Sequence, residues 1–381
     1  MYSALLVAAM TITSLETFIL HVPVTRDGIA DSTHSITHWG MPGVMIHTDA
    51  GQVGYGFTGT HAHLASDRLI TSCIAQCYGE LLVGENPLEI ERLWSMLAYN
   101  PPLQWVGRAG IMTMALAAVD IALWDLKAKA AREPLWKTLG GSENTEVEMY
   151  NTDGGWLNFE LQILVDDAKR LVEEEGYRSI KMKVGKEDFT EDLRRVEAVR
   201  AAVGPGVKLM TDANGRWRMP LAVEVAGRLE DYDVEWIEEP LWHDDVRGHA
   251  ELAAAIKTPV ALGEMLYSLA QFQEFIVAGA VHFVQPDATR LGGISEAWQV
   301  SDAAHAAGLP VTPHAGDMAQ VQAHLSLAHP GISLLEFIPW IKDCFMEPLR
   351  IETGSLCSPQ QPGAGTTLRA SALERFGKPS A

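Results

Sequence analysis

Cysteine is scarce in this chain, because only Cys73, Cys77, Cys344 and Cys357 occur among 381 residues. So few cysteines argue against a fold that depends on a framework of disulfide bonds. Cys73 and Cys77 have the i, i+4 spacing of one helix face, but no nearby histidine or further cysteine completes a set of four metal ligands. We therefore expect two buried thiols at this position and no metal site.

Positive charge is also in short supply. Lysine and arginine total 29 against 49 aspartate and glutamate residues, which gives a net charge of −20 and an isoelectric point near 5.0. Such an excess of negative charge disfavours binding to nucleic acid or to an anionic membrane. The apolar start MYSALLVAAM contains no basic residue, and Glu16 soon interrupts it. We therefore expect neither a signal peptide nor a membrane span, and predict a cytoplasmic protein.

Two different patterns divide the chain. In the first region, alternating apolar residues around the turns DAG and GYG indicate antiparallel strands. The later segments PLEIERLWSML and IMTMALAAVDIALWDLKAKAA indicate helices. The sequence therefore predicts an α+β domain over residues 1–140.

From residue 146 onward, short β-branched runs alternate with amphipathic helical patterns about eight times. Such alternation predicts an α/β fold with a parallel sheet, and eight strands in this length indicate a closed, TIM-like barrel over residues 141–340. The first strand is not followed by GxGxxG, so a Rossmann fold is not expected. Residues 341–381 show no repeat unit and are predicted to return to the first domain.

A polar residue ends almost every predicted barrel strand, about one βα unit after the previous one. The carboxyl ends of barrel strands meet at one mouth, where the active sites of this fold lie. One such residue alone would be explained as a helix cap or a surface charge. The regular recurrence makes that explanation very weak for the whole set, which comprises Lys183, Asp212 with Asn214, Glu238, Glu264, Asp287, His314 and Glu336.

Asp212, Glu238 and Glu264 come from three consecutive strands with no lysine among them. Converging carboxylates repel one another unless a cation neutralises them, and hard oxygen ligands favour Mg²⁺, or Mn²⁺, over zinc. Asn214 can add an amide oxygen or orient a bound water, or it can be a turn residue of the DANG segment. Glu239, next to Glu238, is expected to point the other way and to be a cap or a surface charge.

Two bases flank these acids. Asp287 and His314 lie on adjacent strands, so the carboxylate can hold one imidazole nitrogen and raise the basicity of the other. Lys183 lies on the far side of the predicted metal ligands. Lys181 and Lys183 point to the same face of one strand, and we expect their like charges to lower the pKa of Lys183 toward neutrality.

Together, these residues resemble the enolase superfamily, in particular its mandelate racemase subgroup. The resemblance extends over nearly the whole chain and depends on KMK at 181–183, TDANG at 211–215, EWIEEPL at 235–241, LGE at 262–264, QPDATRLGGI at 285–294 and TPHAG at 312–316. It implies a (β/α)7β barrel with an α+β capping domain that the C-terminal segment completes. Family chains begin near a stretch like MTITSLET, which suggests that residues 1–9 are an extension.

The resemblance also implies roles for the polar residues. Mg²⁺ is expected on Asp212, Glu238 and Glu264, a pattern known for this superfamily together with a Lys or His base. Lys183 is expected to be one acid/base and the His314–Asp287 pair the other. Glu336 is expected to hydrogen-bond the substrate carboxylate as an electrophilic group, and Lys181 to neutralise that carboxylate.

The shared chemistry of the family is abstraction of the proton alpha to a carboxylate. We expect dehydration of a sugar acid, an aldonate of five or six carbons, to a 2-keto-3-deoxy acid. A racemase, epimerase or lactone cycloisomerase of related acids is the alternative, and a non-catalytic sugar-acid-binding barrel is a more remote one. A homo-oligomer is expected by analogy with the family.

Polar segments of the first domain suit the hydroxyl groups of such a substrate. They run from 27 to 40 and from 58 to 63, and Thr152 and Asp153 follow the first barrel strand. Each residue has a solvated loop position as its alternative explanation. Candidate contacts in the two segments are His34, His38, Trp39, His61 and His63.

Overall fold

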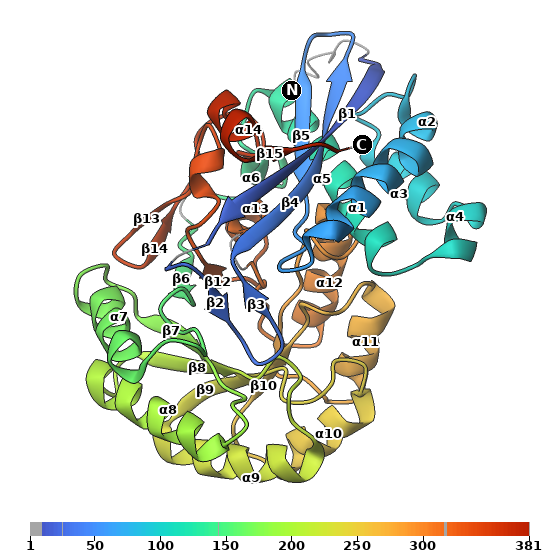
Figure 1. The fold of residues 1–381 in the computed structure, drawn as a ribbon. Helices are drawn as coiled ribbons and strands as arrows, with labels where there is room; N and C mark the ends of the chain where they lie inside the picture. Colours follow the sequence, from blue (N-terminus) through green and yellow to red (C-terminus); the bar gives the residue numbers. More distant parts are fainter. Residues whose placement is uncertain (1–9, 25, 144, 316–317, 381) are drawn as a thin grey trace.

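The computed structural model describes residues 10–24, 26–143, 145–315 and 318–380. An antiparallel sheet with helices lies above a barrel of parallel strands and outer helices (Figure 1). The predicted fold class, a TIM-like barrel with an α+β capping domain, is confirmed. The suggestion that residues 1–9 are an extension lies outside the described residues.

The capping sheet has the strand order β15-β1-β4-β5. Strand β1 exposes polar residues in its first half and buries the apolar run Phe18, Ile19 and Leu20 in its second half. It pairs antiparallel with β4 and, on its other side, with β15, so the end of the chain returns to the first sheet (Figure 1). The strands are β1 (Ile12–Pro23), β4 (His38–Thr48), β5 (Val53–Phe57) and β15 (Gly377–Lys378).

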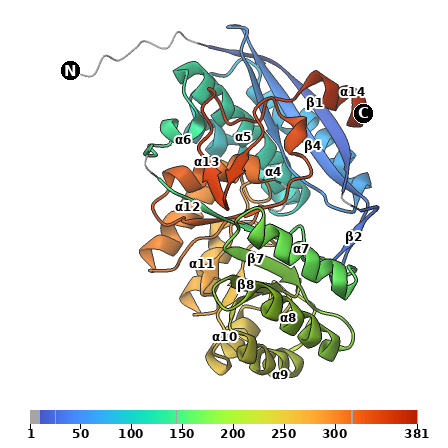
Figure 2. The ribbon, with the colours of Figure 1, turned by 90° about the vertical axis from the view of Figure 1, so that its left-hand side faces the viewer.

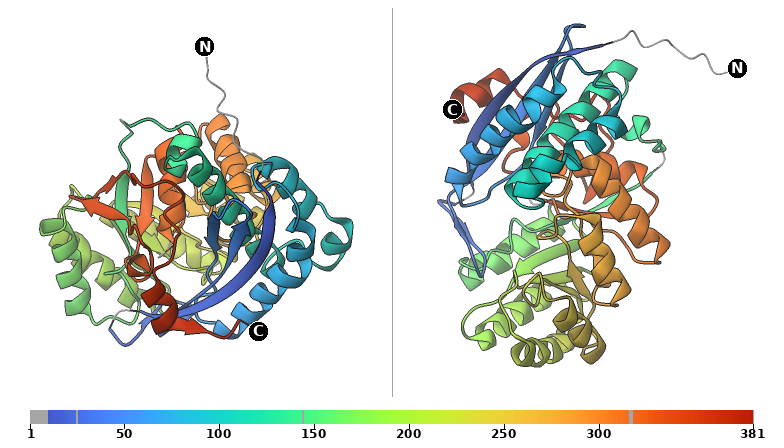
Figure 3. Two further views of the ribbon diagram at one scale, coloured as in Figure 1. Left: turned by 90° about the horizontal axis from the view of Figure 1, so that it is seen from above. Right: turned by 90° about the vertical axis from the view of Figure 1, so that its right-hand side faces the viewer.

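Helices cover one face of this sheet (Figure 3). The central one, α5, is apolar on nearly all sides because it packs between the sheet and the barrel helices. The elements of this layer are η1 (Leu64–Ser66), α1 (Asp67–Cys73), the π-helical turn η2 (Ile74–Tyr78), α2 (Gly79–Leu82), α3 (Ile90–Ala98), α4 (Pro101–Val106), α5 (Ile111–Ala131) and α6 (Leu135–Thr138). The predicted thiols Cys73 and Cys77 are free, the first buried and the second half-buried.

The barrel strands run parallel in chain order from β6 to β11, and β12 pairs with β6 to close the ring. The seventh position is a single bridge residue, Val311, between Val284 and Ile332. The strands are β6 (Glu148–Asn151), β7 (Ser179–Lys183), β8 (Lys208–Asp212), β9 (Val234–Glu238), β10 (Val260–Leu262), β11 (Phe283–Val284) and β12 (Leu334–Phe337). These strands lie within 141–340, and the domain boundaries themselves stay a prediction.

Helices alternate with these strands and surround them (Figure 2). They are α7 (Leu161–Glu173), α8 (Phe189–Val203), α9 (Met219–Leu229) with η3 (Glu230–Tyr232), α10 (Val246–Ala255), α11 (Leu269–Val277), α12 (Ile294–Ala306) and α13 (Ala319–Ala328). Inside the barrel, Tyr150, Met210 and Trp236 form a buried apolar layer beneath the mouth. None of the helices in the described part of the chain has the length and hydropathy to cross a bilayer.

The C-terminal segment connects barrel and cap. Strand β14 pairs with the first barrel strand, and α14 packs on β1 before β15 joins the capping sheet. Its elements are η4 (Lys342–Cys344), β13 (Arg350–Glu352), β14 (Ser355–Cys357) and α14 (Ala370–Phe376).

A short hairpin of the cap reaches the mouth of the barrel. Strands β2 (Ile29–Ala30) and β3 (Ser35–Ile36) pair antiparallel, and the turn between them extends toward the barrel strands (Figures 1 and 3). The Ser32 hydroxyl donates to the carbonyl of Ala213 at 2.8 Å, just past the end of β8. Cap and barrel therefore jointly enclose the space above the strand ends.

The contact between β5 and α5 depends on glycine. A Cβ atom on Gly56 would lie 1.9 Å from the carbonyl oxygen of Ala118, a distance that no real contact allows. Gly56→Ala should therefore push helix and sheet apart and lower the free energy of unfolding by about 2–3 kcal/mol, a typical cost of overpacking. Urea denaturation followed by circular dichroism measures the change. Gly206→Ala is the control, since its Cβ meets nothing within 4 Å, and equal stability of both variants would contradict the prediction.

Candidate active site

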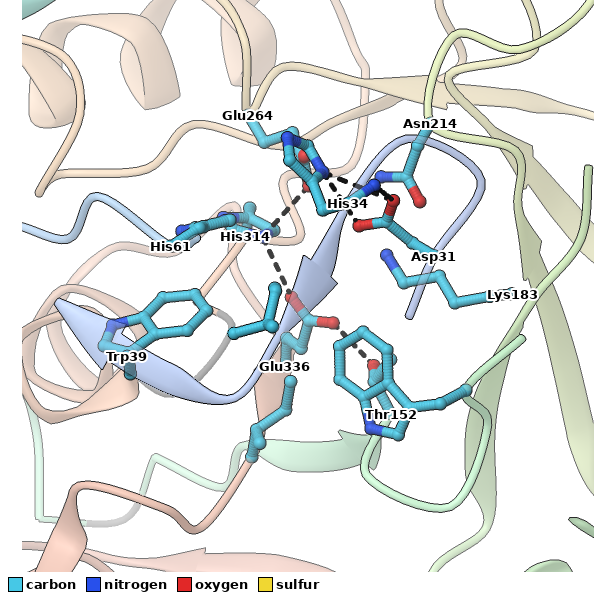
Figure 4. A pocket seen from close by; sticks show the side chains of 13 residues that line it. Asp31, His34, Trp39, His61, Thr152, Lys183, Asn214, Glu264, His314 and Glu336 are labelled. Carbon is cyan, nitrogen blue, oxygen red and sulfur yellow. Dashed lines mark hydrogen bonds and ion pairs between the residues drawn. The ribbon is translucent and has the colours of Figure 1, made fainter. Parts of the chain in front are cut away.

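The polar residues that end the barrel strands come together at one mouth, as the sequence predicts. In a parallel barrel every strand reaches this mouth with its carboxyl end, so their side chains share one space. All of them except Asn214 are buried. Figure 4 shows Lys183, Asn214, Glu264, His314 and Glu336 around a cavity that the cap closes from the other side.

Three carboxylates converge in this space. Asp212, Glu238 and Glu264 each offer one oxygen atom, and these atoms lie within 4.8 Å of one another. The side-chain oxygen of Asn214 is buried nearby and has no hydrogen-bond partner among the described residues. A set of hard oxygen donors with an unpartnered amide oxygen beside it fits Mg²⁺ or Mn²⁺. These residues could therefore hold the predicted divalent ion.

Lys181 and Lys183 neutralise part of the negative charge of these carboxylates. Lys181 Nζ lies 2.6 Å from Glu238 Oε1 and 2.9 Å from Glu336 Oε1, while Lys183 Nζ lies 2.5 Å from Asp212 Oδ2. Burial alone would favour the neutral form of both amines, but the carboxylates beside them favour the charged form. Burial raises the pKa of Glu238 to about 7, against the opposing charge of Lys181.

The predicted fall in the pKa of Lys183 is wrong for this arrangement. Burial and the charge of Lys181 do lower the pKa of Lys183, the second as expected. Asp212, in direct contact, acts in the opposite direction, and the pKa of Lys183 is raised above its ordinary value. An opposite charge at contact distance outweighs a like charge farther away.

His314 is held from both sides. Its Nδ1 lies 2.8 Å from Asp287 Oδ2, and its Nε2 lies 3.0 Å from Glu264 Oε2. Burial lowers the pKa of His314, but Glu264 and Asp287 outweigh burial and raise it well above the ordinary value. The imidazole is therefore charged, with Nε2 directed at the metal-ligand side of the cavity.

Two side chains that sequence reasoning missed fix Asp287. Its Oδ1 accepts hydrogen bonds from Thr289 Oγ1 and from Gln322 Nε2, both at 2.7 Å. Thr289, two residues after Asp287 in the PDAT segment, could have been found as a local turn residue. Gln322 lies on α13, and nothing in the sequence around it points to Asp287. Both residues keep the carboxylate oriented toward His314.

Glu336 is surrounded by donors and cations. It accepts from Thr152 Oγ1 at 2.5 Å and from the backbone N–H of Ala315 at 3.2 Å, and Lys181 is its ion-pair partner. Burial raises the pKa of Glu336, but Lys181 and His314 outweigh it, so the pKa is lowered. In this state Glu336 is an acceptor, whereas the expected electrophilic role requires a proton on it.

Glu239 does not point away from the site as predicted. Its side chain is buried, its Oε1 has no hydrogen-bond partner among the described residues, and nearby Glu264 and Asp212 add to burial in raising its pKa. Strand β9 ends at Glu238, and Glu239 adopts a positive φ of 40°. The alternation of a strand therefore no longer sets its direction.

The cap supplies the remaining walls of the cavity. Of the predicted contacts, His34, Trp39, His61 and Thr152 line it, and their roles toward a substrate stay predictions. His38 and His63 are exposed, and Asp153 accepts from Trp340 instead, so these three do not line the cavity. Asp31, which the sequence did not single out, does. The other lining residues are Ile36, Trp156, Lys183, Asn214, Glu264, His314, Glu336 and Ile338.

Comparison with known proteins gives the family. Residues 14–140 match the mandelate racemase / muconate lactonizing enzyme N-terminal domain, and residues 164–372 match the enolase C-terminal domain-like family. Among curated proteins, L-talarate/galactarate dehydratase of Salmonella typhimurium is 40% identical over 75% of this chain and 71% of its own length. The 3,6-anhydro-alpha-L-galactonate cycloisomerase of Streptomyces coelicolor is 34% identical over 92% of this chain and 94% of its own.

Solved structures agree with these matches. The Salmonella typhimurium dehydratase, liganded with Mg and L-lyxarohydroxamate, superposes with a TM-score of 0.89 at 33% identity, covering 100% of this chain and 96% of the other. L-Talarate dehydratase from Polaromonas sp. JS666, complexed with Mg and L-glucarate, superposes with a TM-score of 0.88 at 34% identity. The match covers 97% of this chain and 98% of the other. The chain therefore belongs to the enolase superfamily, in its mandelate racemase and muconate lactonizing enzyme group.

Proposed function

We propose that this protein is a Mg²⁺-dependent dehydratase of a sugar acid. It removes the proton alpha to the carboxylate and the hydroxyl on the next carbon, which gives a 2-keto-3-deoxy acid. The observation that carries the proposal is the convergence of Asp212, Glu238 and Glu264 within 4.8 Å, with an amine at Asp212 and an imidazole at Glu264. Relatives named as dehydratases of galactarate, arabinonate, L-galactonate and gluconate support it.

A bound Mg²⁺ supplies positive charge to the carboxylate oxygens that gain electrons when the alpha proton leaves. Lys183 takes that proton once its amine is neutral, a state that burial and Lys181 favour and Asp212 opposes. His314 is charged and donates from Nε2 to the departing hydroxyl, which leaves as water. The C–H electron pair becomes the new C=C bond as the C–O bond breaks. The enol then tautomerises to the 2-keto acid.

Lys181, Thr152 and Glu336 lie where they can hold the reacting carboxylate. Lys181 is fully charged and buried, so it offsets the negative charge that substrate binding adds. A substrate carboxylate beside Glu336 brings a second negative charge into the same buried space, and this favours a proton on one of the two groups. Protonated Glu336 then donates to the substrate carboxylate from one of its oxygens. The other Glu336 oxygen, Oε1, accepts from Thr152.

Cycloisomerisation is the second candidate, because relatives named as cycloisomerases are 34% and 31% identical over most of this chain. Both reactions begin at the same proton and differ in the product. Incubation with a panel of sugar acids and Mg²⁺, scored for 2-keto acid and by NMR, separates them. The cytoplasmic location and the homo-oligomeric state expected from the sequence stay predictions.

Loss of either base should abolish turnover without affecting the metal. Lys183→Ala and His314→Asn should each lower kcat by about 10³-fold or more, since acid/base groups contribute about 10²–10⁴-fold. Mg²⁺ affinity, measured by calorimetry, should stay within about threefold of wild type. Lys208→Ala and His305→Asn, both exposed and away from the mouth, are the matched controls. Near-normal rates in both site variants would defeat the assigned roles.

Removal of one ligand charge should weaken metal binding. Glu238→Gln is nearly isosteric but loses the negative charge, so the dissociation constant for Mg²⁺ should rise by about tenfold or more. Glu235→Gln serves as the control, because it makes the same change on the same strand at a half-buried position outside the cluster. Unchanged affinity in Glu238→Gln would remove this residue from the ligand set.

Protons should compete with the metal near neutrality. The pKa of Glu238 is raised to about 7, and a carboxylate binds Mg²⁺ only after it has lost its proton. Affinity should therefore fall as the pH drops from about 8 through 7 to 6, and the decline should be smaller in Glu238→Gln. Calorimetric titrations at these three pH values test this. A constant affinity across the range would show that Glu238 is already ionised.

A further inference from the structure

Asp31 and His34 form a fixed pair at the tip of the β2–β3 hairpin, above the cavity (Figure 4). The hairpin is held in place, because Ser32 donates to the Ala213 carbonyl at 2.8 Å and the backbone N–H of Ala30 donates to Asn158 Oδ1 at 2.8 Å. The Asp31 carboxylate points toward Lys183 and is only 6% exposed. The cap thus places a buried acid in the wall of the barrel mouth.

Hydrogen bonds keep Asp31 ionised. Its Oδ1 accepts from the backbone N–H groups of Thr33 and His34 at 2.7 and 2.6 Å, and His34 Nδ1 lies 3.0 Å from Oδ2. Burial raises the pKa of Asp31, but His34 and Lys183 outweigh it, and the pKa is lowered. A carboxylate that accepts several N–H bonds retains its charge.

The cavity has little positive charge to spare for a second anion. Lys183 is the single lysine among the described lining residues, and no arginine is among them. Lys183 already contacts Asp212, and the ring of His34 is paired with Asp31. Burial and Arg290 lower the pKa of His61, so its ring is neutral. A carboxylate at the far end of a substrate would meet the negative Asp31, and the cations beside Asp31, Lys183 and His34, already have carboxylate partners.

A neutral polyol chain finds better partners. Its hydroxyl groups can donate to Asp31 and to the unpartnered side-chain oxygen of Asn214. Ile36, Trp39 and Trp156 line the same cavity, and their apolar surfaces suit the C–H groups of a sugar chain. Like-charge repulsion against one ligand class, combined with good contacts to the other, is how sites discriminate.

We propose that Asp31 is a specificity residue that selects sugar acids with an uncharged polyol end over diacids with a carboxylate at both ends. The inference depends on the proposed function, since it concerns the substrate of that same site. It separates aldonates from aldarates and goes beyond the shared chemistry of proton abstraction. A residue that only held the hairpin turn would affect both classes equally.

Matched pairs of acids provide the test. Galactonate and galactarate, gluconate and glucarate, and arabinonate and arabinarate differ only in the oxidation state of the last carbon. With Mg²⁺-loaded wild-type protein, kcat/KM for the best monoacid should exceed that for its diacid by at least tenfold. Asp31→Asn retains an oxygen acceptor but loses the charge, so this ratio should narrow at least fivefold, through a faster reaction of the diacid.

Asp27→Asn is the matched control. It makes the same change near the base of the hairpin, at an exposed position outside the cavity, and should leave the ratio unchanged. Binding gives an independent readout. Dissociation constants of the same acid pairs are measured with Mg²⁺-loaded His314→Asn, which retains Lys183 beside Asp31. The monoacid should bind more tightly than its diacid. The ratio of the two dissociation constants should fall when Asp31→Asn is added to this variant.

The outcomes separate the two proposals. Absence of a 2-keto product from every acid, together with a binding preference for monoacids that Asp31→Asn removes, would end the dehydratase proposal and support the role of Asp31. Equal or faster turnover of the diacid by wild type would overturn the role of Asp31 and leave the dehydratase proposal standing. An unchanged ratio in Asp31→Asn, or loss of activity toward both classes alike, would also overturn it.

Discussion

The arrangement at the barrel mouth depends on the balance of charge in a space that excludes most water. Acids from five strand ends are buried there, and Lys181, Lys183 and His314 lie among them at contact distance. Burial of one unpaired charge costs several kcal/mol, so neither the acids nor the bases could occupy this space alone. The barrel supplies this balance because parallel strands bring all their carboxyl ends to one edge.

The site contains two acid–histidine pairs that are supported in different ways. Asp287 holds His314 within the barrel and is itself fixed by Thr289 and Gln322, side chains of two different elements. Asp31 holds His34 within one hairpin turn and is fixed mainly by backbone N–H groups of that turn. The first pair is rigid enough to orient a proton transfer. The second lies in the cap, on a loop outside the barrel, and loops of this kind carry specificity in many folds.

Barrel and cap also differ in the contacts that hold their residues in place. Within the barrel mouth, the charged groups are held by close partners, as Glu336 is by Thr152, Ala315 and Lys181. The cap approaches through close packing of β5 on α5 and through the β2–β3 hairpin over the strand ends. The proposed metal binding and proton transfer therefore use residues of the barrel, whereas the proposed selection of the substrate tail uses a residue of the cap.

The sequence by itself determined which residues share the mouth. Periodicity locates strand ends, and the geometry of a parallel barrel then places Lys183, Asp212 and His314 together without further information. The same local reasoning failed where the local pattern ends: Glu239 follows the last residue of β9, and a positive φ turns it inward.

Only the tertiary structure decided how these groups behave. The pKa of Lys183 depends on an Asp212 oxygen 2.5 Å away. The number of residues between the two in the sequence does not reveal that distance. Gln322 and Asp31 reach the site from α13 and from the cap hairpin, through packing of elements far apart in sequence. Electrostatic interactions act through space and fall steeply with distance and exposure, so they become defined only when the chain is folded.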